Sequence, residues 1–101
     1  MARMNREQLL EVAAAHFEAA PDETGRVDLI GEKGSINVAA EAGEMKAAFK
    51  RIKKAVPGYR WVMINREDLF AANSLSIGTK AGLITPDGTI LKNADIPRRK
   101  V

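Results

Sequence analysis

The sequence of 101 residues contains no cysteine, one histidine and five aromatic residues. Without cysteine the chain forms no disulfide and no thiolate zinc site, and it has no cysteine nucleophile. A structural zinc site needs several imidazole or thiolate ligands, which a single histidine does not supply. No apolar run reaches the roughly 20 residues of a membrane span, and charged residues occupy the N-terminal positions where a signal peptide is apolar. These absences predict a cytoplasmic protein with no metal or other cofactor.

The common catalytic arrangements are missing as well. No serine lies in the G-x-S-x-G elbow that exposes a nucleophile. The stretch SIGTKAG, residues 76–82, has glycine, threonine and lysine, but not in the order that forms a phosphate-binding loop. His16 shares a helical face with Leu9 and Ala13, which favours a buried or interface histidine over a general base. The sequence therefore predicts a protein that is not an enzyme.

What is present is a succession of short periodic segments. They predict a helix over 6–20, a hairpin over 26–39, a helix over 41–56, a strand over 59–64, a short helix over 65–72, and two or three further strands. We therefore predict a single α+β domain over 1–101, with an antiparallel or mixed sheet of about four to five strands. The two main helices are predicted to pack on one face, and residues 96–101 to form a flexible basic tail.

Two local signals in this succession are specific. Asn5 and Gln8 stand three residues apart before an apolar run, which is the pattern of a capping box. Pro86, Asp87 and Gly88 follow β-branched residues in the order that predicts a turn with Gly88 at a left-handed position.

The charge of the chain is divided along the sequence. Residues 1–44 carry nine acids and four lysines or arginines, a net of −5, whereas residues 45–101 carry four acids and twelve lysines or arginines, a net of +8. A basic region of this kind raises the local concentration of acidic partners if the fold keeps it together. If the fold instead interleaves the two halves, their fields cancel.

The helix predicted over 41–56 concentrates much of this positive charge. At 100° per residue Met45, Phe49 and Ile52 fall on one face. The rest of the circumference carries five cations: Lys46, Lys50, Arg51, Lys53 and Lys54. Glu44 precedes this run, but no acid is interleaved with it at the i,i+4 spacing typical of a helix that is merely solvated.

Further candidate contact residues lie beside and beyond this helix. Tyr59 and Arg60 follow it closely, Arg66 follows the next strand, and the predicted tail adds three cations: Arg98, Arg99 and Lys100. Tyrosine beside cations can provide a stacking surface for nucleic-acid bases. A tail of cations can wrap an anionic partner.

These residues suit two functions. The first is a non-enzymatic binding protein that uses a basic helix face to engage an acidic partner, either nucleic acid or a nucleoprotein complex. The alternative is a protein-binding inhibitor or adaptor, for example a phage-type inhibitor of a host nucleic-acid-handling or defence complex, with Tyr59, Arg60 and Arg66 as anchors. A third interpretation is that the cations are only the polar side of an ordinary helix, because lysine favours helices and complements their C-terminal dipole.

Overall fold

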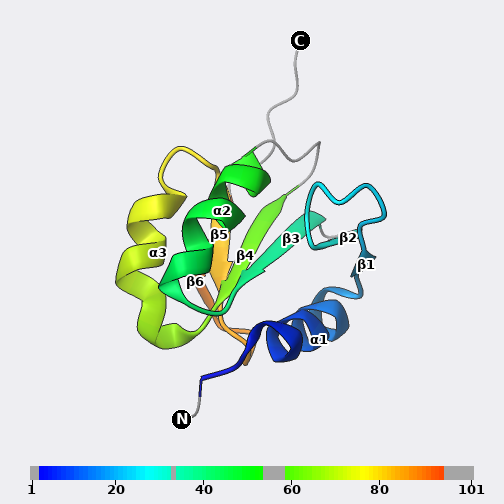
Figure 1. The fold of residues 1–101 in the computed structure, drawn as a ribbon, viewed down its shortest axis with the longest axis horizontal. Coiled ribbons are helices and arrows are strands. Elements are labelled where there is room, and N and C mark those ends of the chain that lie inside the picture. The colour runs from blue at the N-terminus through cyan, green and yellow to red at the C-terminus, as the bar shows by residue number, and fades with distance from the viewer. Residues whose placement is uncertain (1–2, 33, 54–58, 95–101) are drawn as a thin grey trace.

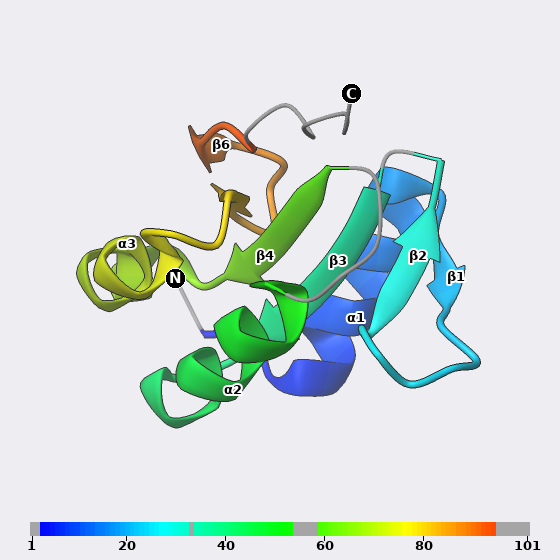
Figure 2. The ribbon, with the colours of Figure 1, turned by 90° about the horizontal axis from the view of Figure 1, so that it is seen from above.

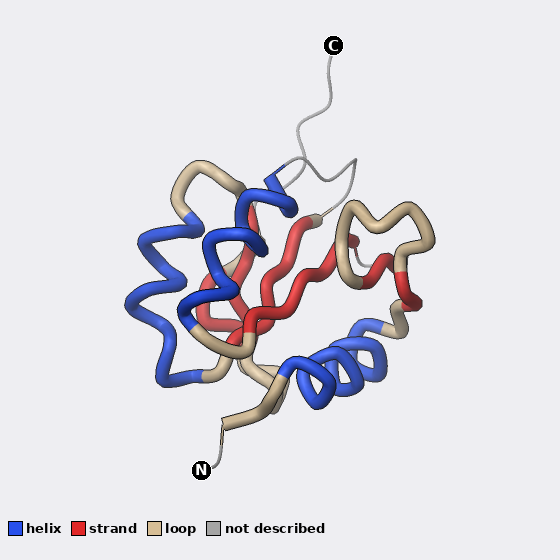
Figure 3. Tube along the Cα trace, in the orientation of Figure 1, coloured by secondary structure: helices blue, strands red, loops and turns tan. Residues whose placement is uncertain are grey.

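The structure of the protein is a computed structural model that describes residues 3–32, 34–53 and 59–94. Three α-helices surround one six-stranded sheet (Figure 1, Figure 3). In chain order the elements are α1 (Arg6–Phe17), β1 (Ala20–Pro21), β2 (Leu29–Gly31), β3 (Gly34–Ala39), α2 (Ala42–Lys53), β4 (Arg60–Ile64), the 3₁₀ turn η1 (Arg66–Asp68), α3 (Leu69–Ser76), β5 (Ala81–Ile84) and β6 (Ile90–Lys92). No helix in the described segments has the length and apolar composition needed to cross a membrane.

The order of the strands in the sheet is the same as their order in the chain. The three central strands β3, β4 and β5 run parallel, while β1, β2 and β6 pair with their neighbours in the antiparallel sense. Parallel neighbours need a crossover connection, and α2 and α3 provide the two crossovers. The sheet is therefore mixed, with β1 and β6 at its two edges.

The side chains of the central strands alternate between two apolar clusters. One cluster, on the α1 side, includes Leu9, Ala13, Phe17, Ile36, Val38 and Met63. The other, on the side of α2 and α3, includes Met45, Phe49, Ile52, Val62, Ile64 and Leu83. Because successive strand residues point to opposite faces, α1 lies on one face of the sheet, and α2 and α3 lie on the other (Figure 2).

The α+β class and the mixed sheet predicted from the sequence are confirmed. Two details differ: the sheet has six strands instead of four to five, and the two main helices do not share one face. The reason for the second difference lies in β4, where Val62 and Met63 are both fully buried although they point to opposite faces. A strand that is apolar on both sides needs a helix on each.

Both local signals are confirmed. The Asn5 side chain accepts from the Gln8 nitrogen at 2.9 Å, and the Gln8 side chain accepts from the Asn5 nitrogen at 2.9 Å. In the turn between β5 and β6, Gly88 has a φ of +88° and its nitrogen donates to the Thr85 oxygen at 2.9 Å.

His16 was predicted to be buried or to lie at an interface, and the structure shows that it is not buried. The side chain lies on the exposed side of α1, and its ring meets the Phe17 ring edge-on with centroids 5.0 Å apart. The helical spacing from Leu9 and Ala13 gives only an approximate direction for the His16 side chain. In the structure this side chain lies just outside the face of α1 that packs on the sheet. The predicted tail over 96–101 lies outside the described residues.

Candidate acidic-partner interface

The helix α2 is strongly divided between a buried and an exposed side. Met45, Phe49 and Ile52 pack into the core against the sheet, as their helical spacing predicts. Lys46, Lys50 and Lys53 are exposed. Their spacing of four and three residues aligns them in one row, the α2 stripe, which extends roughly 10 Å along the helix at 1.5 Å per residue.

The three lysines of the α2 stripe have no partner among the residues that the structure describes. The ion pairs found there involve Arg3, Arg6 and Arg51, and no hydrogen bond joins a stripe lysine to another described side chain. Ammonium groups that no carboxylate neutralises attract an approaching anion, and this attraction weakens as salt is added. This part of the predicted basic face is therefore open to a ligand.

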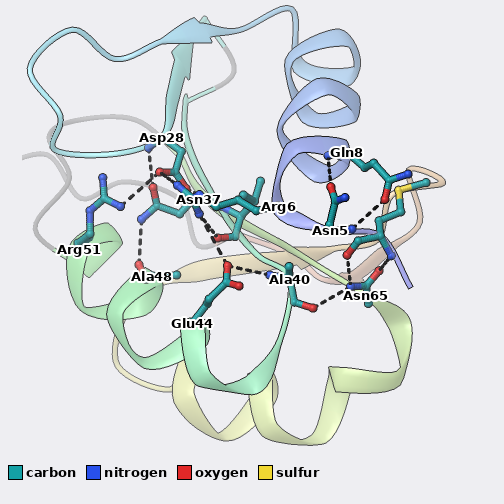
Figure 4. A network of polar contacts seen from close by, with 12 residues as sticks. Asn5, Arg6, Gln8, Asp28, Asn37, Ala40, Glu44, Ala48, Arg51 and Asn65 are labelled. Carbon is teal, nitrogen blue, oxygen red and sulfur yellow. Dashed lines mark hydrogen bonds and ion pairs between the residues drawn. The ribbon is translucent and has the colours of Figure 1, made fainter. Parts of the chain in front are cut away.

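Arg51 was predicted to belong to the same face, but it serves the fold. Its guanidinium lies 3.3 Å from the Asp28 carboxylate and donates to the Gly25 oxygen at 3.0 Å. Arg6 from α1 approaches the same carboxylate at 2.7 Å, so two cations share one buried acid (Figure 4). The Asp28 side chain is only 6% exposed, and its charge requires such partners. Arg51 thus joins α2 to the segment before β2.

A second polar contact fixes α2 on the sheet. Asn37 in β3 is fully buried; its amide nitrogen donates to the Ala48 oxygen of α2 at 2.9 Å, and its oxygen accepts from the Asp28 nitrogen at 2.7 Å (Figure 4). A buried amide is tolerated when both of its ends are bonded. Together with the Arg51 ion pair, this contact sets the direction in which the α2 stripe faces.

The candidates at the start of β4 are only partly available. Arg60 is half-buried and donates to the Thr79 oxygen at 3.0 Å, so its guanidinium serves the junction between β4 and β5. Tyr59 is 42% exposed, and its carbonyl accepts from the Ser35 nitrogen at 2.9 Å. Gly34 makes this approach possible, because any Cβ there would overlap the Tyr59 carbonyl.

Arg66 lies at the opposite end of β4, roughly 20 Å from Arg60 at the usual strand rise. It is exposed and borders a surface cavity of about 440 Å³, whose lining also includes Met4, Asn65, Pro86 and Asp87. The Asn65 amide bonds within the protein, to both backbone groups of Met4 and to the Ala40 oxygen. Tyr59, Arg60 and Arg66 are therefore not brought together as one anchor point.

The charge of Arg66 is opposed by a nearby carboxylate. The Thr85 hydroxyl and the Thr89 nitrogen donate to Asp87, and these hydrogen bonds, with a smaller contribution from the Arg66 charge, lower the pKa of Asp87 to about 2. Asp87 is therefore ionised at neutral pH. An anion that approaches Arg66 meets this negative charge as well, which makes the cavity a weaker anion site than the α2 stripe.

Of the remaining predicted residues, Lys54, Arg98, Arg99 and Lys100 lie outside the described residues. Within the described segments, no group of histidine, aspartate and glutamate side chains is arranged to hold a metal ion. Comparisons with protein-family models, with curated proteins and with solved structures give no significant match to this chain.

Two features of this surface were missed in the sequence. The buried Asn37 had a usable signal, because it is a polar residue in the otherwise apolar stretch INVAA. The choice of Asp28 as the partner of Arg51 had none, because other acids such as Glu32 and Glu67 are closer to Arg51 in the sequence.

Proposed function

We propose that this protein is a non-enzymatic binding protein that sets the α2 stripe against an acidic partner, namely nucleic acid or a nucleoprotein complex. One observation carries the proposal: Lys46, Lys50 and Lys53 form an exposed row on one helix, and no described carboxylate neutralises them. An ordinary solvated helix mixes both signs of charge on its exposed side.

The surroundings of the stripe suit contact with a phosphate backbone. Lysine is a compact point charge on a long stem, so it contacts phosphates without demanding one geometry. The helix below it is held by the Asn37 bond to Ala48 and by the Arg51 ion pair with Asp28, so binding does not have to order the backbone first. Such contacts are largely independent of nucleic-acid sequence.

The alternative function, a protein-binding inhibitor or adaptor, rests on different residues. Its predicted anchors Tyr59, Arg60 and Arg66 are divided between the two ends of β4, and the Arg60 guanidinium bonds to the Thr79 oxygen. Binding hot spots usually cluster near the centre of an interface. The α2 stripe is therefore the better basis for a proposal.

The test is the salt dependence of binding to duplex DNA of unrelated sequence, followed by fluorescence anisotropy. Each phosphate contact contributes a slope of roughly 0.9 to log K against log [salt]. Replacing Lys46, Lys50 and Lys53 together with glutamine is expected to flatten the slope by roughly 2.7 if all three contact phosphates. The free energy of unfolding should change by no more than about 0.5 kcal/mol, because none of them packs in the core.

The matched control replaces the same three lysines with arginine, which keeps the charge and should keep the slope. Equal slopes for the glutamine variant and the wild type would remove the stripe from the interface. If the wild type binds neither duplex nor single-stranded nucleic acid at low salt, the nucleic-acid form of the proposal fails. An acidic protein recovered with the wild type and lost with the glutamine variant would then point to the protein surface of a complex.

A further inference from the structure

The two edges of the sheet are protected to different degrees. The edge strand β1 has two residues, and one of them is Pro21, which has no N–H to offer. Short edge strands that contain proline are a usual way to prevent pairing with other chains. The opposite edge strand β6 contains no proline, and no described strand pairs with its outer side.

The side chains of β6 also leave its outer side accessible to another strand. The Lys92 ammonium points inward and donates to the Ser76 hydroxyl of α3 at 2.9 Å, while Ile90 is 51% exposed. After β6 the described chain turns over the face of the sheet. Gly82 has no room for a side chain, because a Cβ there would lie 2.5 Å from the Ala94 nitrogen and 2.6 Å from the Trp61 ring. The described part of the chain thus leaves the edge open.

The helix beside this edge has an exposed apolar flank. Phe70 is 90% exposed, and Ile77, which directly follows α3, is 74% exposed. Exposed apolar residues that form one patch mark interaction sites. Ile77 is the C-cap of α3 and keeps a helical φ of −61°, so the spacing of seven residues places it on the same side as Phe70, with Asn73 between them. We call Phe70, Asn73 and Ile77 the α3 flank.

The position of the α3 flank relative to the sheet follows from the helix itself. Ala72 and Ser76 are buried, and Ser76 bonds to Lys92 of β6. Successive side chains of a helix are rotated by about 100° around its axis. Around α3, the buried Ala72 is therefore followed by Ser76, and beyond Ser76 come the three residues of the α3 flank. The α3 flank therefore lies on the β6 side of the helix, away from α2, and extends over the space outside the edge strand.

We propose that this edge is the interface of a symmetric dimer, in which β6 of a second copy pairs antiparallel with β6 of the first. An open strand edge requires a strand as its partner, and a two-fold axis normal to the sheet supplies one from the same chain. That axis places the second α3 on the same face, so Phe70 of each copy meets Ile77 of the other. The sequence of α3, LFAANSLS, contains no charged residue that would repel its copy.

Sedimentation equilibrium measures the proposed association directly. The wild type should approach twice the chain mass of 11.0 kDa as its concentration rises to about 200 µM. Replacing Phe70 and Ile77 with aspartate should hold the mass at that of one chain, because each dimer would then bring four carboxylates together. The matched control is Ala71→Asp, which adds a charge to an exposed position in the same turn but outside the α3 flank.

A crosslinking experiment tests the two-fold geometry without relying on affinity. Asn73 lies midway along the α3 flank, so an axis through the flank brings Asn73 of both copies together. The chain has no cysteine, so Asn73→Cys gives a single thiol that should oxidise to a disulfide dimer, whereas Ala71→Cys should not. A wild type that sediments as one chain at every concentration overturns the proposal, as does a dimer that persists in the aspartate variant. Open-ended oligomers or equal crosslinking at both positions overturn the two-fold arrangement.

Discussion

The helices α2 and α3 cover the same face of the sheet, yet they show opposite surfaces to the outside. The exposed side of α2 carries Lys46, Lys50 and Lys53, whereas α3 has no charged residue and exposes Phe70 and Ile77. Their positions explain the difference. α2 lies over β3, β4 and β5, so its large apolar residues are buried against the sheet, while α3 contacts β5, next to the edge strand β6.

The comparison shows that the place of a helix in its layer determines how many of its apolar residues the sheet can bury. A central helix can bury a full apolar face, so the residues left outside are free to be basic. A helix at the border has one flank that the sheet below it does not cover, and apolar residues on such a flank mark an interaction surface. The two proposals follow this division, with an acidic partner on α2 and a second copy on α3.

The largest expected effect contrasts the two kinds of apolar residue. Ile52→Ala in α2 should lower the free energy of unfolding by about 2–5 kcal/mol, because the side chain is fully buried and its removal leaves a cavity. Phe70→Ala in α3 should change it by no more than about 0.5 kcal/mol. Urea unfolding at low protein concentration, where self-association is negligible, measures both. Similar losses for the two variants would mean that the α3 flank packs on its own chain.

The next largest effect tests whether the ion pair of Arg51 stabilises the fold, unlike the lysines around it. Asp28→Asn should lower the free energy of unfolding by about 1–3 kcal/mol, because it removes the carboxylate that forms ion pairs with both Arg6 and Arg51. The matched control is Glu11→Gln, which neutralises an exposed acid of α1 that has no ion pair among the described residues. Thermal and urea unfolding compare the two variants. If they lose equal stability, the Arg51 contact is only a surface pair.

The smallest effect concerns the turn that brings β6 beside α3. The hydrogen bonds from Thr85 and Thr89 lower the pKa of Asp87 to about 2, below its value in the unfolded chain. A carboxyl group with a depressed pKa stabilises the fold above its unfolded pKa, and this contribution is lost as the pH falls through about 2. Asp87→Asn should therefore lower stability at neutral pH, and the difference from the wild type should disappear toward pH 2. A difference that is independent of pH would assign the loss to the shape of the turn.

The features that the sequence predicts correctly are those set by neighbours in the chain. The capping box of Asn5 and Gln8 and the left-handed Gly88 depend on residues a few positions apart, and both are present as predicted. The buried side of α2 also follows directly from the spacing of Met45, Phe49 and Ile52. Local geometry determines such features before any tertiary contact forms.

The features that could not be predicted depend on which elements become neighbours. The helical position of Arg51 gives its direction, but only the fold brings Asp28 to it. Nothing in the sequence shows that Phe70 is exposed, because this depends on which elements pack beside α3. The same holds for the face covered by α1. The continuous apolar run WVMI, residues 61–64, shows that β4 is buried on both sides without showing which helix covers which face.

The agreement between strand order and chain order affects how the protein can form during synthesis. No strand has to insert between two that are already paired, so each new strand adds to an edge that is present when it leaves the ribosome. Pairing between successive segments also keeps the loops to be closed short, which favours fast folding. Growth of this kind always leaves the newest strand at the border. β6 is the last of the described strands to be made, and it lies at the edge of the sheet opposite β1.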